Sequence, residues 1–356
     1  MKKIVLSFTL ILSLVVLAAC GGSRQTLHVL NWGEYMDEDL IAEFETEFNV
    51  RVVYDEVGSN EEMEVRILTG TTPYDIAIPS DYMIDKLRQS NMLNSIDRSL
   101  LPALADINFI PDALALYEND PIYDYMIPYF WGTIGIIYNT ANPAVVEAVE
   151  TLGFGALFDS NSTFRRGMYD SPRDAVAAAL LYLGFDVNST NEAELAQAEA
   201  LLIAANFTVF GEDNLKGLVA EGSLDMALVY SGDFFDIEYA YYVDDLEINF
   251  DFYAPQKTNV WIDGFVIPTT SENIELAHQF INFFLDIDRN VQNSDYVGYT
   301  PVIETVFDIM VEEYEYEHPA YFPNPEGSER VMYRYISQAH DQALSNLLNR
   351  VKIATE

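Results

Sequence analysis

The stretch TLHVLNWGEYMDEDLIAEFETEFNVRVVY (residues 26–54) decides the fold. Residues 26–31 and 50–54 are short, mostly apolar runs, and each predicts a strand. Between them, residues 37–48 place apolar side chains at helical spacing with acids on the opposite face (Leu40, Ile41, Phe44 and Phe48). Strands joined by a single helix predict a parallel sheet covered by helices, so the chain begins as an α/β protein.

The same alternation continues outward from this stretch. Further helices are predicted at residues 60–68, 81–89, 174–183, 191–205, 273–285 and 328–351, and further strands at residues 75–78, 226–230, 249–253 and 260–267. A chain of 356 residues exceeds the size at which one hydrophobic core keeps growing, so we expect two lobes. Because parallel sheets bind ligands beyond the carboxyl ends of their strands, the segments that follow these strands are candidate site segments.

The composition excludes several classes of function. The chain has 57 Asp and Glu residues against 18 Lys and Arg residues, a formal net charge of −39, which excludes a nucleic-acid partner held by a basic face. A single Cys excludes a disulfide scaffold and any metal site built from several Cys residues. No G-x-S-x-G, P-loop or H-E-x-x-H motif is present, and the four His residues are scattered, so we predict no catalytic residue, metal or cofactor.

The N-terminus has the pattern of an export signal. Lys2 and Lys3 precede an apolar run (residues 4–17) that is too short for an ordinary membrane span, and small residues end it. Leu17-Ala18-Ala19-Cys20 resembles a bacterial lipoprotein lipobox, in which Cys20 is lipidated. We therefore expect residues 1–19 to be a signal peptide and residues 20–26 a lipidated N-terminus and linker. The alternative is a plain secretory signal with an incidental Cys.

Aromatic rings and carboxylates coincide where the predicted strands end. The four groups are Trp32, Glu34 and Tyr35; Ser80, Asp81 and Tyr82; Tyr230 and Asp233; and Trp261 and Asp263. A ring face attracts an organic ammonium and packs on its methylenes, while a carboxylate accepts charge-assisted hydrogen bonds from it. The pattern favours a site for an alkylammonium ligand. The structural alternative is that the rings belong to the core and the acids face solvent.

The mature chain also resembles the spermidine/putrescine-binding proteins that serve polyamine ABC importers. The matching stretches are Asn31–Tyr35, Tyr74–Tyr82, Ile127–Gly132, Asp170–Ala175, Trp261–Pro268 and Gly298–Pro301. The resemblance implies a type II periplasmic-binding-protein fold, with a ligand cleft between two lobes and two crossing segments. It divides the chain into residues 27–132 plus 264–307 (lobe 1) and residues 133–263 plus 308–353 (lobe 2). It also implies a monomer that binds without catalysis, meets the permease subunits of the importer and is anchored outside the cytoplasm by lipid.

The resemblance further assigns site residues by position. Five rings would line the cleft (Trp32, Tyr35, Tyr230, Trp261 and Tyr299), three acids would meet the amines (Glu34, Asp174 and Asp263), and Ser80 and Tyr82 would add polar contacts. Two positions depart from the family. Ser171 stands where some members have a carboxylate, and Arg334 stands where some have a neutral amide. The three acids and Arg334 together give the site a charge close to −2. Putrescine, a diammonium ion, should therefore bind at least as tightly as spermidine. Asp81 or Asp233 could restore the balance by reaching the cleft.

Two other functions remain open at this point. A related binding protein for an anion, a metal complex or thiamine would need basic or backbone donors at the strand ends, where acids and rings stand instead. An extracellular glycosidase would use a pair of carboxylates, which 57 acids also supply by chance. Turnover of the bound molecule distinguishes the glycosidase from a binding protein.

Overall fold

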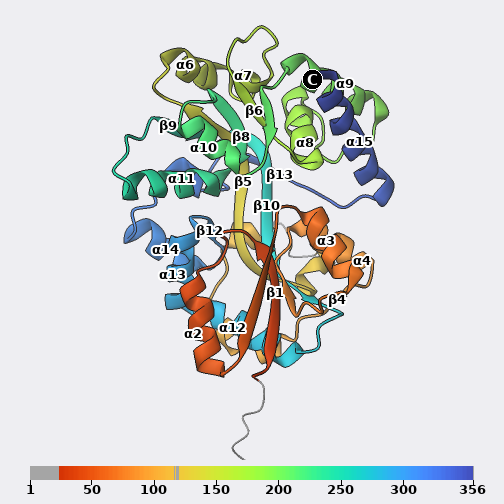
Figure 1. Ribbon diagram of the computed structural model, residues 1–356, viewed down its shortest axis with the longest axis vertical. Coiled ribbons are helices and arrows are strands. Elements are labelled where there is room, and N and C mark those ends of the chain that lie inside the picture. The colour runs from red at the N-terminus through yellow and green to blue at the C-terminus, as the bar shows by residue number, and fades with distance from the viewer. Residues whose placement is uncertain (1–23, 116, 118–119, 356) are drawn as a thin grey trace, which may run out of the picture.

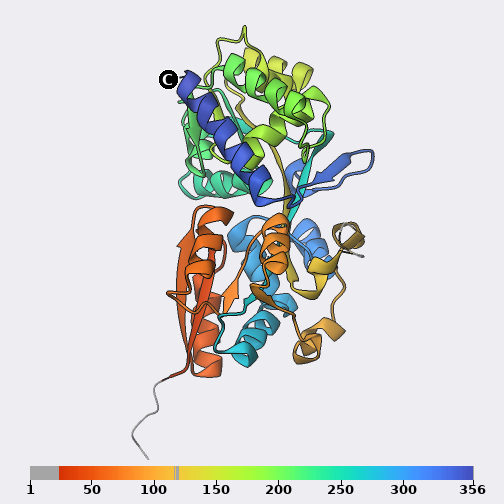
Figure 2. The same cartoon turned by 90° about the vertical axis from the view of Figure 1, so that its right-hand side faces the viewer.

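The computed structural model describes residues 24–115, 117 and 120–355, and it has two lobes stacked along its longest axis. Figure 1 shows the N-terminal strand in the lower lobe and the C-terminal helix in the upper lobe. The turned view in Figure 2 shows the same two bodies, joined near the middle by a few chain segments. Cys20 and the whole expected signal lie outside the described residues.

The lower lobe is built on the stretch that opens the sequence analysis. Strands β1 (Thr26–Trp32), β2 (Arg51–Val57) and β3 (Ile76–Ala77) form a parallel sheet in the order β2-β1-β3. Helices α2 (Glu38–Phe48) and α3 (Asn60–Thr69) connect these strands, and α4 (Asp81–Gln89) follows β3. The rest of the lobe comes from β4 (Leu93–Asn94), η1 (Arg98–Leu100), η2 (Pro102–Ala105), α5 (Pro111–Ala115), η3 (Pro121–Asp124), β11 (Ile267–Pro268), α12 (Ile274–Phe284), α13 (Ile287–Val297), β12 (Thr300–Pro301) and α14 (Glu304–Glu312).

The upper lobe repeats the α/β style. It contains α6 (Pro143–Leu152), α7 (Gly155–Phe158), β6 (Arg166–Tyr169), α8 (Pro172–Leu183), α9 (Glu192–Ala205), β7 (Val209–Gly211), α10 (Asn214–Ala220), β8 (Met226–Tyr230), α11 (Ser231–Val243), β9 (Phe250–Tyr253), η4 (Pro319–Tyr321), β13 (Glu329–Met332) and α15 (Gln338–Thr355). Helices α8, α9 and α15 pack against one another at one side of the lobe (Figure 1).

Two long strands connect the lobes. Strands β5 (Ile127–Asn139) and β10 (Lys257–Phe265) are antiparallel neighbours and run vertically through the centre of Figure 1. They belong to an eight-stranded sheet of order β13-β10-β5-β8-β6-β7, in which β9 and β12 also pair with β5. All residues of β5 except the last are buried, as expected of a strand covered on both faces. This confirms the expected α/β class, with two lobes and two crossing segments.

The predicted helix over residues 328–351 is wrong in its first part. Residues 329–332 form β13, which pairs in parallel with Lys257–Val260 of β10, and α15 begins only at Gln338. This strand depends on a partner more than 70 positions away in the sequence, and such pairing overrides local helix preference. The lobe boundaries at residues 132/133, 263/264 and 307/308 stay a prediction. Within the described residues, no helix is long and apolar enough to cross a membrane.

Candidate ligand-binding cleft

A cavity of about 850 Å³ takes its lining from both lobes. The lower lobe contributes the segments that follow β1, β2 and β3, and the upper lobe contributes those that follow β6, β7 and β8. The site thus lies at the carboxyl ends of these strands, where α/β sheets bind ligands. Strand β10 adds Trp261 and Asp263, and the lining also includes Val297, Tyr299 and Tyr333.

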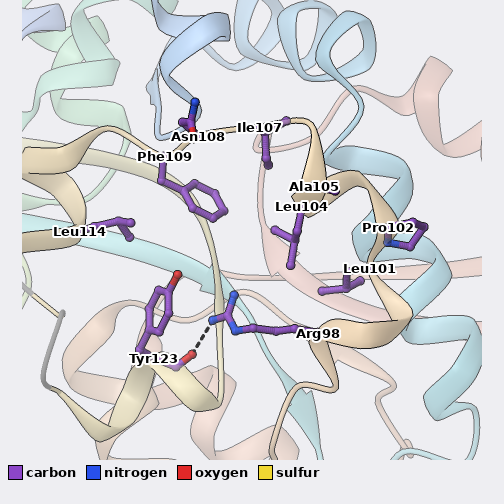
Figure 3. Close-up of a pocket in the computed structure, with 10 residues that line it drawn as sticks. All are labelled: Arg98, Leu101, Pro102, Leu104, Ala105, Ile107, Asn108, Phe109, Leu114 and Tyr123. Atoms are coloured by element: carbon purple, nitrogen blue, oxygen red, sulfur yellow. Dashed lines mark hydrogen bonds between the residues drawn. The ribbon is translucent and has the colours of Figure 1, made fainter.

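A second concavity, of about 640 Å³, lies in the lower lobe among residues 98–123 (Figure 3). Among the described residues that line it there is no carboxylate, and most of these side chains are apolar. Its one cation is already engaged, because Arg98 donates to the carbonyl oxygens of Tyr123 (2.7 Å, the dashed line in Figure 3) and Met126 (3.2 Å). The cavity between the lobes therefore carries the charged chemistry, and the smaller concavity does not.

A continuous series of edge-to-face aromatic rings forms one wall of the cavity. The Tyr35 and Tyr299 ring centroids are 5.4 Å apart, as are those of Tyr299 and Trp261. The series continues from Trp261 to Tyr230 (5.8 Å) and from Tyr230 to Tyr169 (4.9 Å). Rings packed in this way support one another in a fixed geometry, and their exposed faces are suited to methylene groups and cations.

Asp263 is a buried carboxylate of the cleft with one oxygen left without a protein donor in the described structure. It lies on β10 at a register irregularity between Ile262 and Gly264, and its side chain is buried. Its Oδ1 atom has no hydrogen-bond partner within the part of the chain that the structure describes. Burial raises the pKa of Asp263 to about 7, although the nearby Ser80 and Tyr35 hydroxyls act to lower that pKa. A buried carboxylate without a partner is unfavourable unless a ligand supplies the missing donor.

Asp174 and Ser171 meet at the start of α8. Ser171 caps the helix, since its Oγ accepts from the backbone N–H of Asp174 (3.3 Å). The buried Asp174 carboxylate accepts from the hydroxyl of Tyr230 on one oxygen (2.9 Å) and from that of Tyr333 on the other (2.9 Å). Carboxylate oxygens have further lone pairs, so Asp174 can still accept from a ligand while the two tyrosines hold its orientation.

Asp233 occupies a comparable place in the first turn of α11. It accepts from the backbone N–H of Tyr230 (2.9 Å) and from the hydroxyl of Tyr299 (3.1 Å). Burial raises the pKa of Asp233 to about 6, against the opposing effect of the Lys216 charge. Asp233 lines the cavity, whereas Asp81 does not: Asp81 is buried and accepts a hydrogen bond from the Tyr117 hydroxyl (2.6 Å).

The described chain matches a known family along most of its length. Residues 39–322 match the family described as bacterial extracellular solute-binding protein. The chain belongs to this family. Its fold is accordingly the two-lobed periplasmic-binding-protein fold that the sequence predicts, and the family is defined by binding solutes and not by catalysis.

Individual relatives align with most of the length of this solute-binding protein. The putrescine-binding periplasmic protein SpuD of Pseudomonas aeruginosa is 30% identical over 340 residues, which are 91% of this chain and 90% of the relative. The spermidine/putrescine-binding periplasmic protein of Escherichia coli is 30% identical over 81% of this chain and 80% of its own length. The solved spermidine/putrescine ABC transporter substrate-binding protein PotD of Streptococcus pneumoniae superposes with a TM-score of 0.75 at 29% identity, and covers 93% of this chain and 100% of its own.

The structure brings together nearly all of the predicted site residues of the solute-binding protein. Eleven of the twelve line the cavity: Trp32, Glu34, Tyr35, Ser80, Tyr82, Ser171, Asp174, Tyr230, Trp261, Asp263 and Tyr299. Arg334 is the exception and requires a correction, because it is absent from the lining and forms an ion pair with Asp120. Its neighbour Tyr333 takes the place that faces the cavity. Ligand contact by the eleven remaining residues stays a prediction.

The sequence analysis missed several lining residues. Tyr169 ends strand β6 immediately before Asp170, but the sequence analysis predicts no strand there, so its search of strand ends did not reach this ring. Asn60 and Ser80 hold each other by two hydrogen bonds of 3.1 Å, and no pattern in the sequence indicates that pair. No pattern in the sequence indicated Lys216 either, because a lysine next to acids on a short helix is typical of any solvated surface.

Proposed function

We propose that this solute-binding protein captures a polyamine, putrescine and/or spermidine, in the cleft and delivers it to an ABC importer. The observation that carries the proposal is the buried Oδ1 of Asp263, which has no partner among the residues that the structure describes and lines the cleft with the rings of Trp261 and Tyr35. A protonated amine supplies the missing donor and the opposite charge together, and its methylenes pack on the rings. The names of SpuD, of the Escherichia coli relative and of the solved PotD structure agree with this ligand class.

The charge of the lining opposes the anion alternative. Eleven carboxylates line the cavity: Glu34, Glu56, Glu61, Glu62, Asp170, Asp174, Glu212, Asp213, Asp233, Asp236 and Asp263. Of the described residues in the lining, only Lys216 is basic, and acids already engage it. An anionic solute would leave these carboxylates uncompensated, whereas a di- or triammonium ligand neutralises several of them.

Calorimetry with putrescine, cadaverine, spermidine and spermine tests the proposal directly. We expect saturable binding of at least one of the first three, with full recovery of the unaltered ligand. An anion of similar length, such as succinate, is the control and should give no heat of binding. Binding of succinate without binding of any polyamine would overturn the proposal, and release of a cleaved product from an oligosaccharide would favour the glycosidase alternative.

Polyamine affinity should depend on pH because Asp263 must lose its proton to bind an ammonium. With a pKa of about 7 in the empty protein, this carboxyl is mostly neutral at pH 6 and mostly ionised at pH 8. The complex stabilises the ionised form, so affinity falls as the pH falls through 7, by roughly tenfold per pH unit below it. Titrations at pH 8, 7 and 6 measure this slope. Asp263→Asn should flatten it, and an equally steep slope in that variant would assign the proton to another group.

The export signal completes the proposal. We propose that Cys20 is lipidated and anchors the mature protein outside the cytoplasm, in keeping with its membership of an extracellular family. Cys20→Ala should leave the protein without lipid and release part of it from membranes, since anchoring by acyl chains depends on that covalent link. Cell fractionation with and without the substitution measures the release. A variant as firmly membrane-bound as the natural sequence would contradict the anchor.

A further inference from the structure

Lys216 has the surroundings that a bound alkylammonium would have. Its Nζ lies 2.6 Å from Asp213 Oδ1, 2.6 Å from Asp236 Oδ2 and 3.9 Å from Asp233 Oδ1. The side chain is 11% exposed and lines the cavity. Burial lowers the pKa of Lys216, but the charges of the three carboxylates outweigh burial and raise that pKa above its usual value. The lysine therefore holds a permanent positive charge inside the cleft.

The position of this charge matters because the Asp233 oxygen nearest to Lys216 also contacts the aromatic wall. Asp233 Oδ1 accepts from the Tyr299 hydroxyl (3.1 Å), and the Tyr299 ring packs on that of Trp261. An ammonium that followed the aromatic wall from Asp263 toward Asp233 would thus approach the Lys216 ammonium. Two ammonium groups that approach the same carboxylate in a partly buried site repel each other strongly.

Counting the buried charged groups gives the consequence for the ligand. Asp174, Asp233 and Asp263 are the buried carboxylates among the described lining residues. Lys216 adds one positive charge to them, although it also pairs with the more exposed Asp213 and Asp236, so the buried groups alone carry a formal charge of −2. A diammonium ligand matches this charge, whereas the third ammonium of a triamine would share Asp233 with the lysine. The cation that the sequence analysis assigned to Arg334 is thus supplied from another element of the same lobe, helix α10.

We propose that Lys216 is a specificity-determining residue, which occupies the place of a third ammonium and biases the cleft toward diamines over triamines. This inference rests on the proposed polyamine function. The preference would come from repulsion between two ammonium groups next to Asp233, and this repulsion disfavours the longer ligand.

The test is a competition titration of putrescine against spermidine with three proteins. The natural sequence should bind putrescine at least as tightly as spermidine. Lys216→Met keeps an unbranched side chain only one atom shorter but removes its charge, and it should shift the ratio of the two affinities toward spermidine by about tenfold or more. Lys86→Met is the matched control, because Lys86 is 12% exposed, is paired with Glu64 and Asp341, and is absent from the cavity lining. That control can change both affinities together but should leave their ratio unchanged.

Each outcome decides between a specificity role and a structural one. A Lys216→Met protein that loses both ligands equally, or keeps the natural ratio, would overturn the proposal, because a purely structural lysine does not distinguish the ligands. Lys216→Gln serves if the Met variant does not fold, since its amide can still donate to Asp213 and Asp236, and it should shift the ratio in the same direction. Lys216→Arg retains the charge and should retain the ratio. A natural protein that binds neither ligand would instead reject the polyamine function itself.

Discussion

Asp263→Asn should weaken the binding of putrescine and spermidine by roughly 30- to 1000-fold, which corresponds to about 2–4 kcal/mol. The substitution preserves the shape of the side chain but removes the charge that a buried ammonium requires. No protein donor bonds to Oδ1 in the described structure, so the natural carboxylate is available to the ligand. Calorimetric titration of both polyamines at pH 8, where Asp263 is mostly ionised, measures the loss.

Asp81→Asn is the matched control for this prediction. Burial raises the pKa of Asp81 to about 7, as it does for Asp263, but Tyr117 and the backbone N–H of Tyr82 bond to its oxygens. Asp81 is also absent from the cavity lining, so its substitution should change affinity by less than about threefold. Weakening of less than about threefold in Asp263→Asn itself would remove Asp263 from its proposed role.

Gly232→Ala should damage the aromatic wall without removing any functional group. A Cβ atom at Gly232 would lie 2.3 Å from two atoms of the Tyr299 ring, far inside ordinary contact distance. The ring must move, and with it the contacts to Tyr35 and Trp261 and the hydrogen bond to Asp233. We expect a loss of about 1–3 kcal/mol in the free energy of unfolding and roughly 10- to 100-fold in polyamine affinity.

Gly217→Ala provides the comparison, because Gly217 lies on the neighbouring helix α10 and a Cβ atom there would meet nothing within 4 Å. Alanine is the better helix former, so this variant should gain about 0.5–1 kcal/mol and bind polyamines normally. Thermal unfolding and calorimetry on the two variants measure both effects. If Gly232→Ala binds as tightly as Gly217→Ala, the position of the Tyr299 ring does not matter for affinity.

Local patterns in the sequence were sufficient for most of the secondary structure. Helix α4 and strand β8 have the bounds that the pattern predicts, and other predicted elements, such as α2, agree within one or two residues. Short-range physics explains this agreement. Asp37, Ser59 and Asn191 each cap a helix through their own side chains, and a cap depends only on residues two or three positions away.

The tertiary structure decided which charges share the cleft. Trp261 and Asp263 both line it, as expected for residues two apart on a strand, because that relation is set within one segment. The places of Lys216, Asp233 and Arg334 depend on how α10, α11 and the segment after β13 pack against distant strands. Whether a side chain of these segments faces the cavity depends on strand pairings between residues far apart in the chain. The spacing of apolar residues within one segment does not encode such pairings. The sequence by itself therefore determined the α/β class and the ring-and-carboxylate chemistry, whereas long-range packing alone selected which cation lines the cleft.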